Sequence, residues 1–148
     1  MQKRFPMLKV LGVGGCWMFK DKKSAVTKLM PDILRAVSPN QKVHVLFDGD
    51  IQEKINIQQA AHTLADLLQV QGCEVIIQRP PEGKGADDWL VANPDAQLSD
   101  LVTIPLETLE ISRKQLYKRL ELQNNDKDKI ILNEFNASKL LAYAYEGN

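Results

Sequence analysis

Two aspartates separated by one glycine are the residues of this sequence best suited to chemistry. Asp48-Gly49-Asp50 directly follows Val43-His44-Val45-Leu46-Phe47, an apolar run rich in β-branched and aromatic residues that predicts a buried strand. Open parallel sheets bind ligands at the ends where their strands finish. Both carboxylates can then face one hard cation, Mg²⁺ or Mn²⁺, with water and phosphate as further ligands. The alternative is an ordinary surface turn, since many such turns contain Asp-Gly-Asp.

A second polar cluster lies in the segment from Pro81 to Leu90. It offers two glycines for close backbone approach, a lysine that can meet a phosphate, and two aspartates at a predicted helix start. These residues are Gly83, Gly85, Lys84, Asp87 and Asp88. The aspartates have an alternative role, because acidic side chains cap helices and favour their amino ends. Since this segment follows the strand predicted beside the first one, we expect the two loops to share one sheet edge.

Charge is unevenly distributed although the whole chain is neutral, with 19 basic and 19 acidic side chains. Residues 1–28 contain seven Lys or Arg against one Asp, a net charge of +6, whereas residues 29–106 sum to −6. A basic segment of this kind can face a polyanion. We therefore expect weak, sequence-independent binding to single-stranded or primed DNA, and the alternative is a merely solvated face. The candidate contacts are Lys20, Lys22, Lys23 and Lys28.

Composition excludes several classes of protein. With 148 residues, 44% hydrophobic and 26% charged, the chain can bury a core and is neither collagen-like nor wholly disordered. No apolar run approaches the ~20 residues of a membrane span, and the first residues lack the apolar stretch of a secretory leader. Cys16 and Cys73 form no CxxC pair and make a poor zinc set with two histidines. The expected protein is cytoplasmic, with no membrane partner.

A strand–helix–strand unit is the clearest structural prediction. The helix is expected to begin at Asn56, an N-cap with Gln59 in a capping-box position, and to end at Gly72. Its apolar positions recur at helical spacing: Ile57, Ala60, Ala61, Leu64, Ala65 and Leu68. Val75-Ile76-Ile77 predicts the second strand, and a crossover of this length implies parallel pairing.

Further elements are predicted on both sides of this unit. They are a strand over Leu8–Val13, a helix from Pro31 to Val37, a helix over Ala86–Ala92 and a last strand over Leu101–Ile104. The fold class is α/β: a parallel sheet with the Val43–Phe47 strand central and helices on both faces. Residues 1–105 form this domain. Residues 106–148 form a helical appendage or linker, with a helix start at Ser112, a polar link over Gln123–Lys129 and a helical stripe over Phe135–Tyr145.

Four stretches in this order resemble the toprim-like domain of primase and primase-helicase proteins of phages, plasmids and other mobile elements. They are Gly12-Val13-Gly14-Gly15-Cys16-Trp17, Val45-Leu46-Phe47-Asp48-Gly49-Asp50, Gly72-Cys73-Glu74-Val75 and Gly83-Lys84-Gly85-Ala86-Asp87-Asp88-Trp89-Leu90. The resemblance implies a toprim fold and Mg²⁺-dependent nucleotidyl transfer, with nucleotides and a nucleic-acid template as substrates. It gives the catalytic and metal-holding role to Asp48 and Asp50, and it matches Asp87 and Asp88 to the family's trailing acidic pair.

One departure from the family pattern concerns a glutamate. Toprim domains carry a Glu-Gly motif on the strand ahead of the region that matches Gly12, and the residues before Gly12 contain no glutamate. Either the chain is a fragment of a longer protein or its site is incomplete as an isolated catalyst. By analogy, residues 107–148 would begin a linker toward a helicase-like module.

Two other functions remain open. The first is a non-catalytic nucleic-acid-binding or assembly module whose acidic turn is vestigial. The second, a phosphotransfer or receiver-like α/β domain, is ranked last because no strand here ends in the lysine that such chemistry needs.

Overall fold

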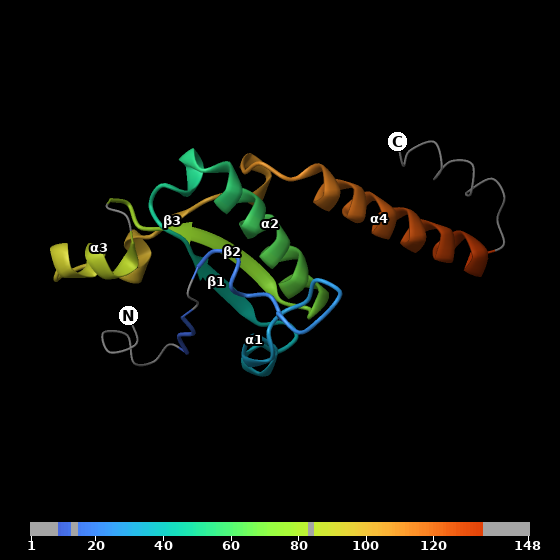
Figure 1. The fold of residues 1–148 in the computed structure, drawn as a ribbon, viewed down its shortest axis with the longest axis horizontal. Helices are drawn as coiled ribbons and strands as arrows, with labels where there is room; N and C mark the ends of the chain where they lie inside the picture. Colours follow the sequence, from blue (N-terminus) through green and yellow to red (C-terminus); the bar gives the residue numbers. More distant parts are fainter. Residues whose placement is uncertain (1–8, 13–14, 83–84, 135–148) are drawn as a thin grey trace. The chain divides into compact units, whose positions relative to one another are not determined.

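A computed structural model of the chain describes residues 9–12, 15–82 and 85–134, with side chains as far as residue 124. The chain divides into two compact units, Met1–Glu110 and Ile111–Asn148. The first unit has a mixed α/β fold, a small three-stranded sheet flanked by helices (Figure 1). The division falls after Glu110 rather than after Pro105, because Leu109 is still buried in the first unit's core. Among the described residues, no helix is long and apolar enough to cross a membrane.

The predicted strand–helix–strand unit is present. It consists of β1 (Lys42–Leu46), α2 (Ile55–Val70) and β2 (Glu74–Arg79). The two strands pair in parallel, with Val43 opposite Val75 and Val45 opposite Ile77. Parallel pairing follows from the crossover, since α2 returns the chain to the end of the sheet at which β1 began.

The apolar face of α2 is buried as its spacing predicts, by Ala60, Ala61, Leu64, Ala65 and Leu68. The predicted start of this helix is wrong, because the N-cap is Lys54 and Asn56 lies within the first turn. Instead of capping, the Asn56 carboxamide oxygen accepts a hydrogen bond from Trp17 Nε1 at 3.1 Å. Gly72 does follow the helix end, at φ +85°, where a side chain would be strained and would also press on Pro39.

The remaining strand departs from the predicted direction. β3 (Val102–Thr103) pairs with β2 in antiparallel fashion, Thr103 opposite Gln78. The connection from β2 runs through α3 (Ala86–Ala92), predicted with these bounds, and returns to the sheet at the end where β2 finishes. β3 begins there, with Val102 opposite Arg79, and it therefore runs back along β2.

The order β1-β2-β3 makes β2 the central strand, so the prediction of a central Val43–Phe47 strand is wrong. The strand predicted over Leu8–Val13 would have flanked β1. Its described part, residues 9–12, is exposed and is not a strand, and its other residues lie outside the described ones. The prediction of an all-parallel sheet is therefore wrong, while the α/β class with flanking helices is confirmed.

Two apolar clusters fill the first unit, one toward each end of α2. The first surrounds Phe19, Leu29, Ile33, Leu64, Leu68 and Cys73. The second surrounds Phe47, Ile51, Ile77, Ile104 and Leu109. Trp89, Leu90 and Ala96 form a smaller cluster that buries one side of α3. Ile33 is contributed by α1 (Pro31–Ala36), which begins at Pro31 as predicted.

In the second unit, α4 (Arg113–Glu134) begins where predicted, and the Ser112 hydroxyl accepts a hydrogen bond from the Gln115 backbone N–H at 3.1 Å. The predicted polar link over Gln123–Lys129 is instead part of α4. That stretch contains no glycine or proline, so nothing in it breaks a helix that is already formed. Residues Phe135–Tyr145 lie outside the described part. The described 3₁₀ helices are Ile51–Glu53, Leu98–Asp100 and Leu106–Thr108.

Candidate cation site at the end of the sheet

The two predicted loops meet at one edge of the sheet. Asp48 follows β1, and the loop leading to Gly85 follows β2, so parallel pairing brings both to the same end. A Cβ atom built on Gly85 would lie 3.3 Å from Asp48 Oδ1, which is tighter than an ordinary contact. Glycine at position 85 therefore leaves room for the Asp48 carboxylate. Asp48 is exposed, and among the described residues its side chain makes no hydrogen bond or ion pair.

Asp50 is held differently. Its Oδ2 forms an ion pair with Lys54 Nζ at 2.7 Å, and its side chain is 27% exposed. The pKa of Lys54 lies above its usual value, first because the ammonium donates a hydrogen bond to Asp50 and then because it is attracted to that charge. Asp48 and Glu53 add smaller attractions. A cation that binds both aspartates would therefore compete with Lys54 for the Asp50 carboxylate.

The turn that carries both aspartates is fixed to the end of β2. Arg79, the last residue of β2, donates from Nε to the Gln52 side-chain oxygen at 2.9 Å and from a terminal nitrogen to the Pro80 carbonyl at 2.9 Å. Gln52 lies in the 3₁₀ helix that continues the Asp48-Gly49-Asp50 turn. The guanidinium thus ties this turn to the neighbouring strand and places a positive charge at the acidic edge.

Asp87 and Asp88 occupy the first turn of α3, where both are exposed. Gly85 is the N-cap of this helix, so its amino end begins beside the Asp48 carboxylate. Within the described part of the chain, no group of three or more His, Cys, Asp and Glu side chains is arranged to hold a metal ion. Gly83 and Lys84, the other predicted phosphate-binding residues, lie outside the described residues.

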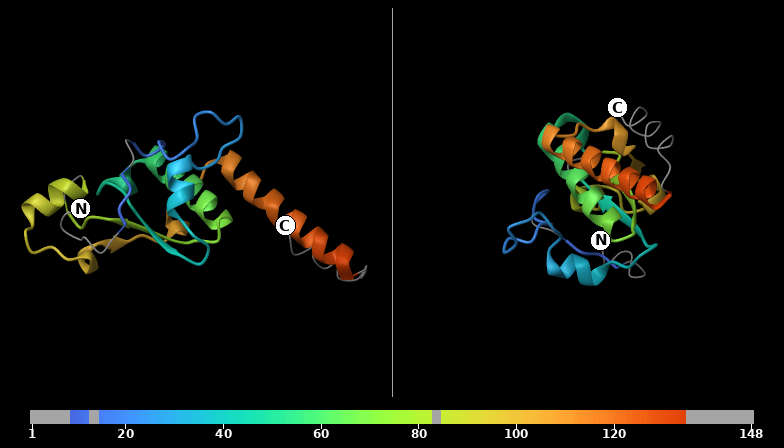
Figure 2. Two further views of the ribbon diagram at one scale, coloured as in Figure 1. Left: turned by 90° about the horizontal axis from the view of Figure 1, so that it is seen from below. Right: turned by 90° about the vertical axis from the view of Figure 1, so that its right-hand side faces the viewer.

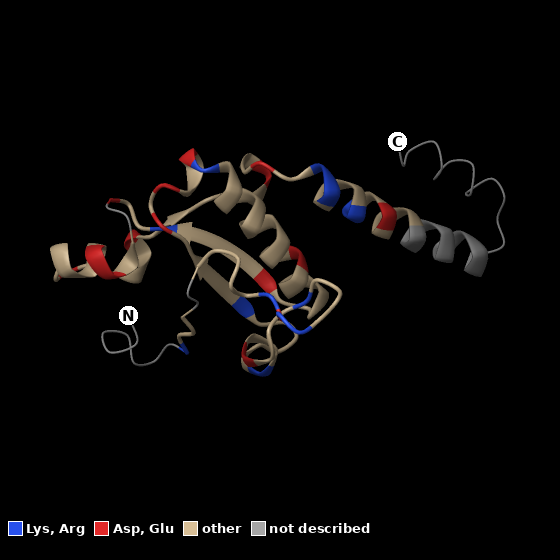
Figure 3. Ribbon diagram, viewed as in Figure 1, with Lys and Arg blue, Asp and Glu red and all other residues tan. Residues whose placement is uncertain are grey.

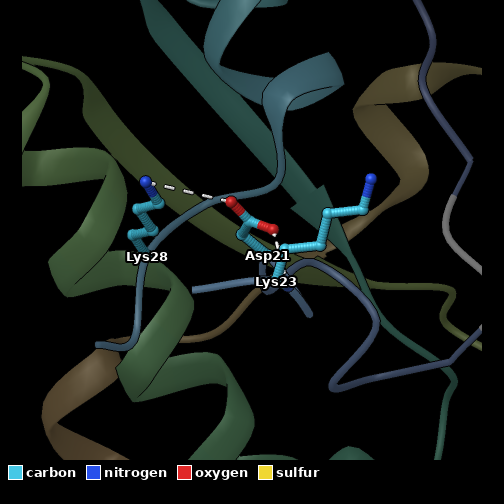
Figure 4. Close-up of polar contacts among 3 residues, drawn as sticks. All are labelled: Asp21, Lys23 and Lys28. Carbon is cyan, nitrogen blue, oxygen red and sulfur yellow. Dashed lines mark hydrogen bonds and ion pairs between the residues drawn. The ribbon is translucent and has the colours of Figure 1, made fainter. Parts of the chain in front are cut away.

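The predicted basic residues form a separate feature. Lys20, Lys22, Lys23 and Lys28 belong to a loop over residues 20–28, hereafter the basic loop, which is closed by a bridge between Lys20 and Leu29. Asp21 lies inside it and pairs with Lys28 at 3.9 Å, while Asp21 Oδ1 accepts from the Lys23 backbone N–H at 3.0 Å (Figure 4). The Lys23 side chain extends away from this pair.

The sequence analysis did not identify three residues that contribute to these sites: Lys54, Arg79 and Asp21. Lys54 stands four residues after Asp50, the spacing of a helical ion pair, and this signal is present in the sequence. Asp21 is recognisable only as the single acid among basic neighbours. Arg79 gives no signal, because its contact with Gln52 depends on how the turn folds back over β2.

Residues 2–97 match a family model described as a domain of unknown function (DUF3854). Because the match covers well over half of the chain, the chain belongs to this family. The matched stretch includes the basic loop, β1, α2, β2 and α3, and it ends before β3. No curated protein and no solved structure matches the chain.

Proposed function

We propose that the first unit is a divalent-cation-binding, toprim-like domain of a primase-type DNA replication protein, in which Asp48 and Asp50 hold Mg²⁺ or Mn²⁺. The observation that carries the proposal is the close approach of Asp48 Oδ1 to Gly85. It joins two of the sequence stretches on which the toprim resemblance rests. Mg²⁺ is commonly held by one or two carboxylates with water and phosphate, and an exposed Asp48 carboxylate suits that arrangement.

The bound cation would supply charge neutralisation for a nucleotide phosphate. The chain's own residues would hold it: Asp48, and Asp50 in competition with Lys54. Glu53 and Glu74 are the nearest glutamates in sequence, and both are poorly placed. Glu53 lies beyond the acidic turn, and Glu74 begins β2 at the opposite end of the strand. General acid or base catalysis typically contributes about 10²–10⁴-fold to the rate, and neither glutamate is placed to provide it. We therefore expect this chain alone to bind a cation but to catalyse little nucleotidyl transfer.

A second function is favoured by the Asp50–Lys54 ion pair. A lysine that neutralises one of the two carboxylates suits a vestigial site in a non-catalytic nucleic-acid-binding or assembly module. The two functions differ in whether a divalent cation binds at Asp48.

Titration of Mn²⁺, followed by calorimetry and by the electron paramagnetic resonance of free Mn²⁺, tests the proposal. Wild-type chain should bind one ion weakly, and Asp48→Asn/Asp50→Asn should reduce the affinity at least tenfold. Asp95→Asn/Asp100→Asn removes the same charge from exposed positions in the same unit and should leave the affinity unchanged. Equal affinity in all three proteins would reject the cation site in favour of the second function. Robust primer synthesis by the wild-type chain would contradict the expectation of an incomplete catalyst.

A further inference from the structure

The basic loop is anchored to the core and closed by backbone hydrogen bonds. Its two ends are anchored by Phe19 and Leu29, which are 1% and 2% exposed and lie in one apolar cluster. Backbone hydrogen bonds close the loop from both sides: Asp21 N–H donates to the Lys28 carbonyl, and Met30 N–H donates to the Phe19 carbonyl, each at 2.8 Å. The loop therefore presents its lysines from a fixed base.

The lysines of the loop differ in what they contact. Lys28 is partly neutralised by Asp21, and Lys20 Nζ lies 4.7 Å from the centre of the Trp17 ring. Lys22 and Lys23 are exposed, and within the described residues neither ammonium forms an ion pair. Asp21 also fixes the backbone of Lys23, as the dashed contacts in Figure 4 indicate. The two charges best available to a ligand are thus those of Lys22 and Lys23.

The part of this surface that the structure describes offers no free aromatic face for stacking. Among the described residues, Trp17 is the aromatic residue beside the loop that is not fully buried, and its ring already contacts Lys20 and stacks on Phe19. Its Nε1 donates to Asn56. Proteins that hold single strands by their bases use free aromatic faces for stacking. A surface with lysines and no free ring contacts phosphates instead, and it does so without regard to base sequence.

The basic loop and the acidic turn lie toward different ends of the sheet. The basic loop lies toward the ends at which β1 and β2 begin, near Leu68 and Cys73 of the same cluster, whereas the acidic turn and α3 lie where the strands finish (Figures 1 and 3).

We infer that the basic loop is a contact site for the sugar–phosphate backbone of a nucleic acid, made through Lys22 and Lys23 and separate from the acidic turn. This inference rests on the proposed function and adds to it the place where the nucleic acid is held. Duplex and single strand should both bind, since phosphates are common to both.

A nucleic acid fits this surface better than an anionic membrane does. Residues 29–110 contain five basic and thirteen acidic side chains, so most of the unit repels a flat anionic surface. A narrow polyanion can touch the loop while avoiding the acidic edge. Val26, 69% exposed, is the largest apolar side chain at the loop tip, and stable insertion into a bilayer needs more apolar area than one valine provides.

The test measures binding of a labelled mixed-sequence duplex, and of one of its strands, by fluorescence anisotropy with chelator present. Salt is varied from about 50 to about 200 mM, the range over which phosphate contacts lose affinity steeply. Lys22→Gln/Lys23→Gln should weaken binding about ten- to hundredfold at the lowest salt. It should also lower the log–log salt slope by about 1.8 for duplex and about 1.4 for the single strand. Lys114→Gln/Lys118→Gln, an equal charge change at exposed positions of α4, is the matched control.

Several outcomes would overturn the inference: equal loss in the control, unchanged affinity in the loop variant, or loop-dependent binding to anionic vesicles with none to nucleic acid. An unchanged thermal unfolding midpoint shows that the loop variant is folded. The Mn²⁺ titration of the same proteins separates the two proposals. Loop-dependent nucleic-acid binding without Mn²⁺ binding rejects the cation site alone, and Mn²⁺ binding without loop-dependent nucleic-acid binding rejects this inference alone.

Discussion

At the scale of single residues, Lys54 and a metal ion compete for the same carboxylate. The Lys54 ammonium lies 2.7 Å from Asp50 Oδ2, and its hydrogen bond to Asp50 and its attraction to that charge hold its pKa above the usual value, so it stays charged at any physiological pH. A divalent cation bound by both aspartates would compete with it for this carboxylate.

Lys54→Gln is therefore expected to raise Mn²⁺ affinity several-fold. The glutamine can still donate a hydrogen bond to Asp50 but carries no charge to displace. Calorimetric titration measures the change, and Lys42→Gln, at an exposed position at the start of β1, is the control for net charge. An affinity that falls, or that rises equally in the control, would mean that Lys54 does not compete with the ion.

Gly85 sets the space around Asp48. Gly85→Ala introduces a Cβ atom 3.3 Å from Asp48 Oδ1, so the carboxylate must move by a few tenths of an ångström. We expect Mn²⁺ affinity to fall several-fold while the free energy of unfolding changes by about 1 kcal/mol or less. Gly12→Ala adds the same methyl group where nothing lies within 4 Å, and it should leave both quantities unchanged. Unaltered Mn²⁺ affinity in Gly85→Ala would separate α3 from the site.

At the scale of elements, α2 holds the end of the first unit through two buried polar side chains. Gln58 is 5% exposed, donates to the Ile51 carbonyl at 3.0 Å and accepts from the Glu110 backbone N–H at 2.8 Å. His62, one turn later, shares a 2.8 Å hydrogen bond with the Leu109 carbonyl. These contacts explain why the first unit extends past Pro105.

Gln58→Ala should lower the free energy of unfolding by about 1–3 kcal/mol, because it leaves the Glu110 backbone N–H without its partner. The Ile51 carbonyl keeps a second hydrogen bond, from the Lys54 backbone N–H at 3.2 Å. Urea denaturation followed by circular dichroism measures the loss. Gln59→Ala, at the next and less buried position of α2, should cost under about 1 kcal/mol. Equal losses in both variants would show that the link through Gln58 contributes little.

Local sequence was sufficient for α1, α2, α3 and the β1–β2 pair, since each depends on apolar periodicity or on residue types within a few positions. It was not sufficient for β3, whose direction depends on where the connection through α3 brings the chain back to the sheet. The same limit applies to the acidic edge. That Asp48 and Gly85 share an edge was predictable from parallel pairing, whereas the contact of Arg79 with Gln52 depends on a turn that no short pattern describes.

At the scale of the whole first unit, Asp21 lowers the positive charge that the basic loop presents to a nucleic acid. Asp21→Asn can keep the hydrogen bond from the Lys23 backbone N–H while releasing Lys28, so the basic loop gains one net positive charge. Affinity for duplex should then rise several-fold at low salt and the salt slope should steepen by about 0.9. Anisotropy titration checks this, with Asp32→Asn, at an exposed position on α1, as the control. Weaker binding by Asp21→Asn would mean that the loop needs this ion pair for its shape.

The closure of the basic loop by Phe19 and Leu29 has a consequence for local opening. A segment joined to the fold by one bridge and two buried side chains can detach while β1 and β2 stay paired. Its amide protons should therefore exchange with solvent far sooner than those of Val45 and Ile77, which open only with the sheet. Hydrogen-exchange mass spectrometry would measure this difference. A nucleic acid bound to the loop should slow amide exchange in residues 19–30 alone. The protected amides would then identify the segment that contacts the nucleic acid.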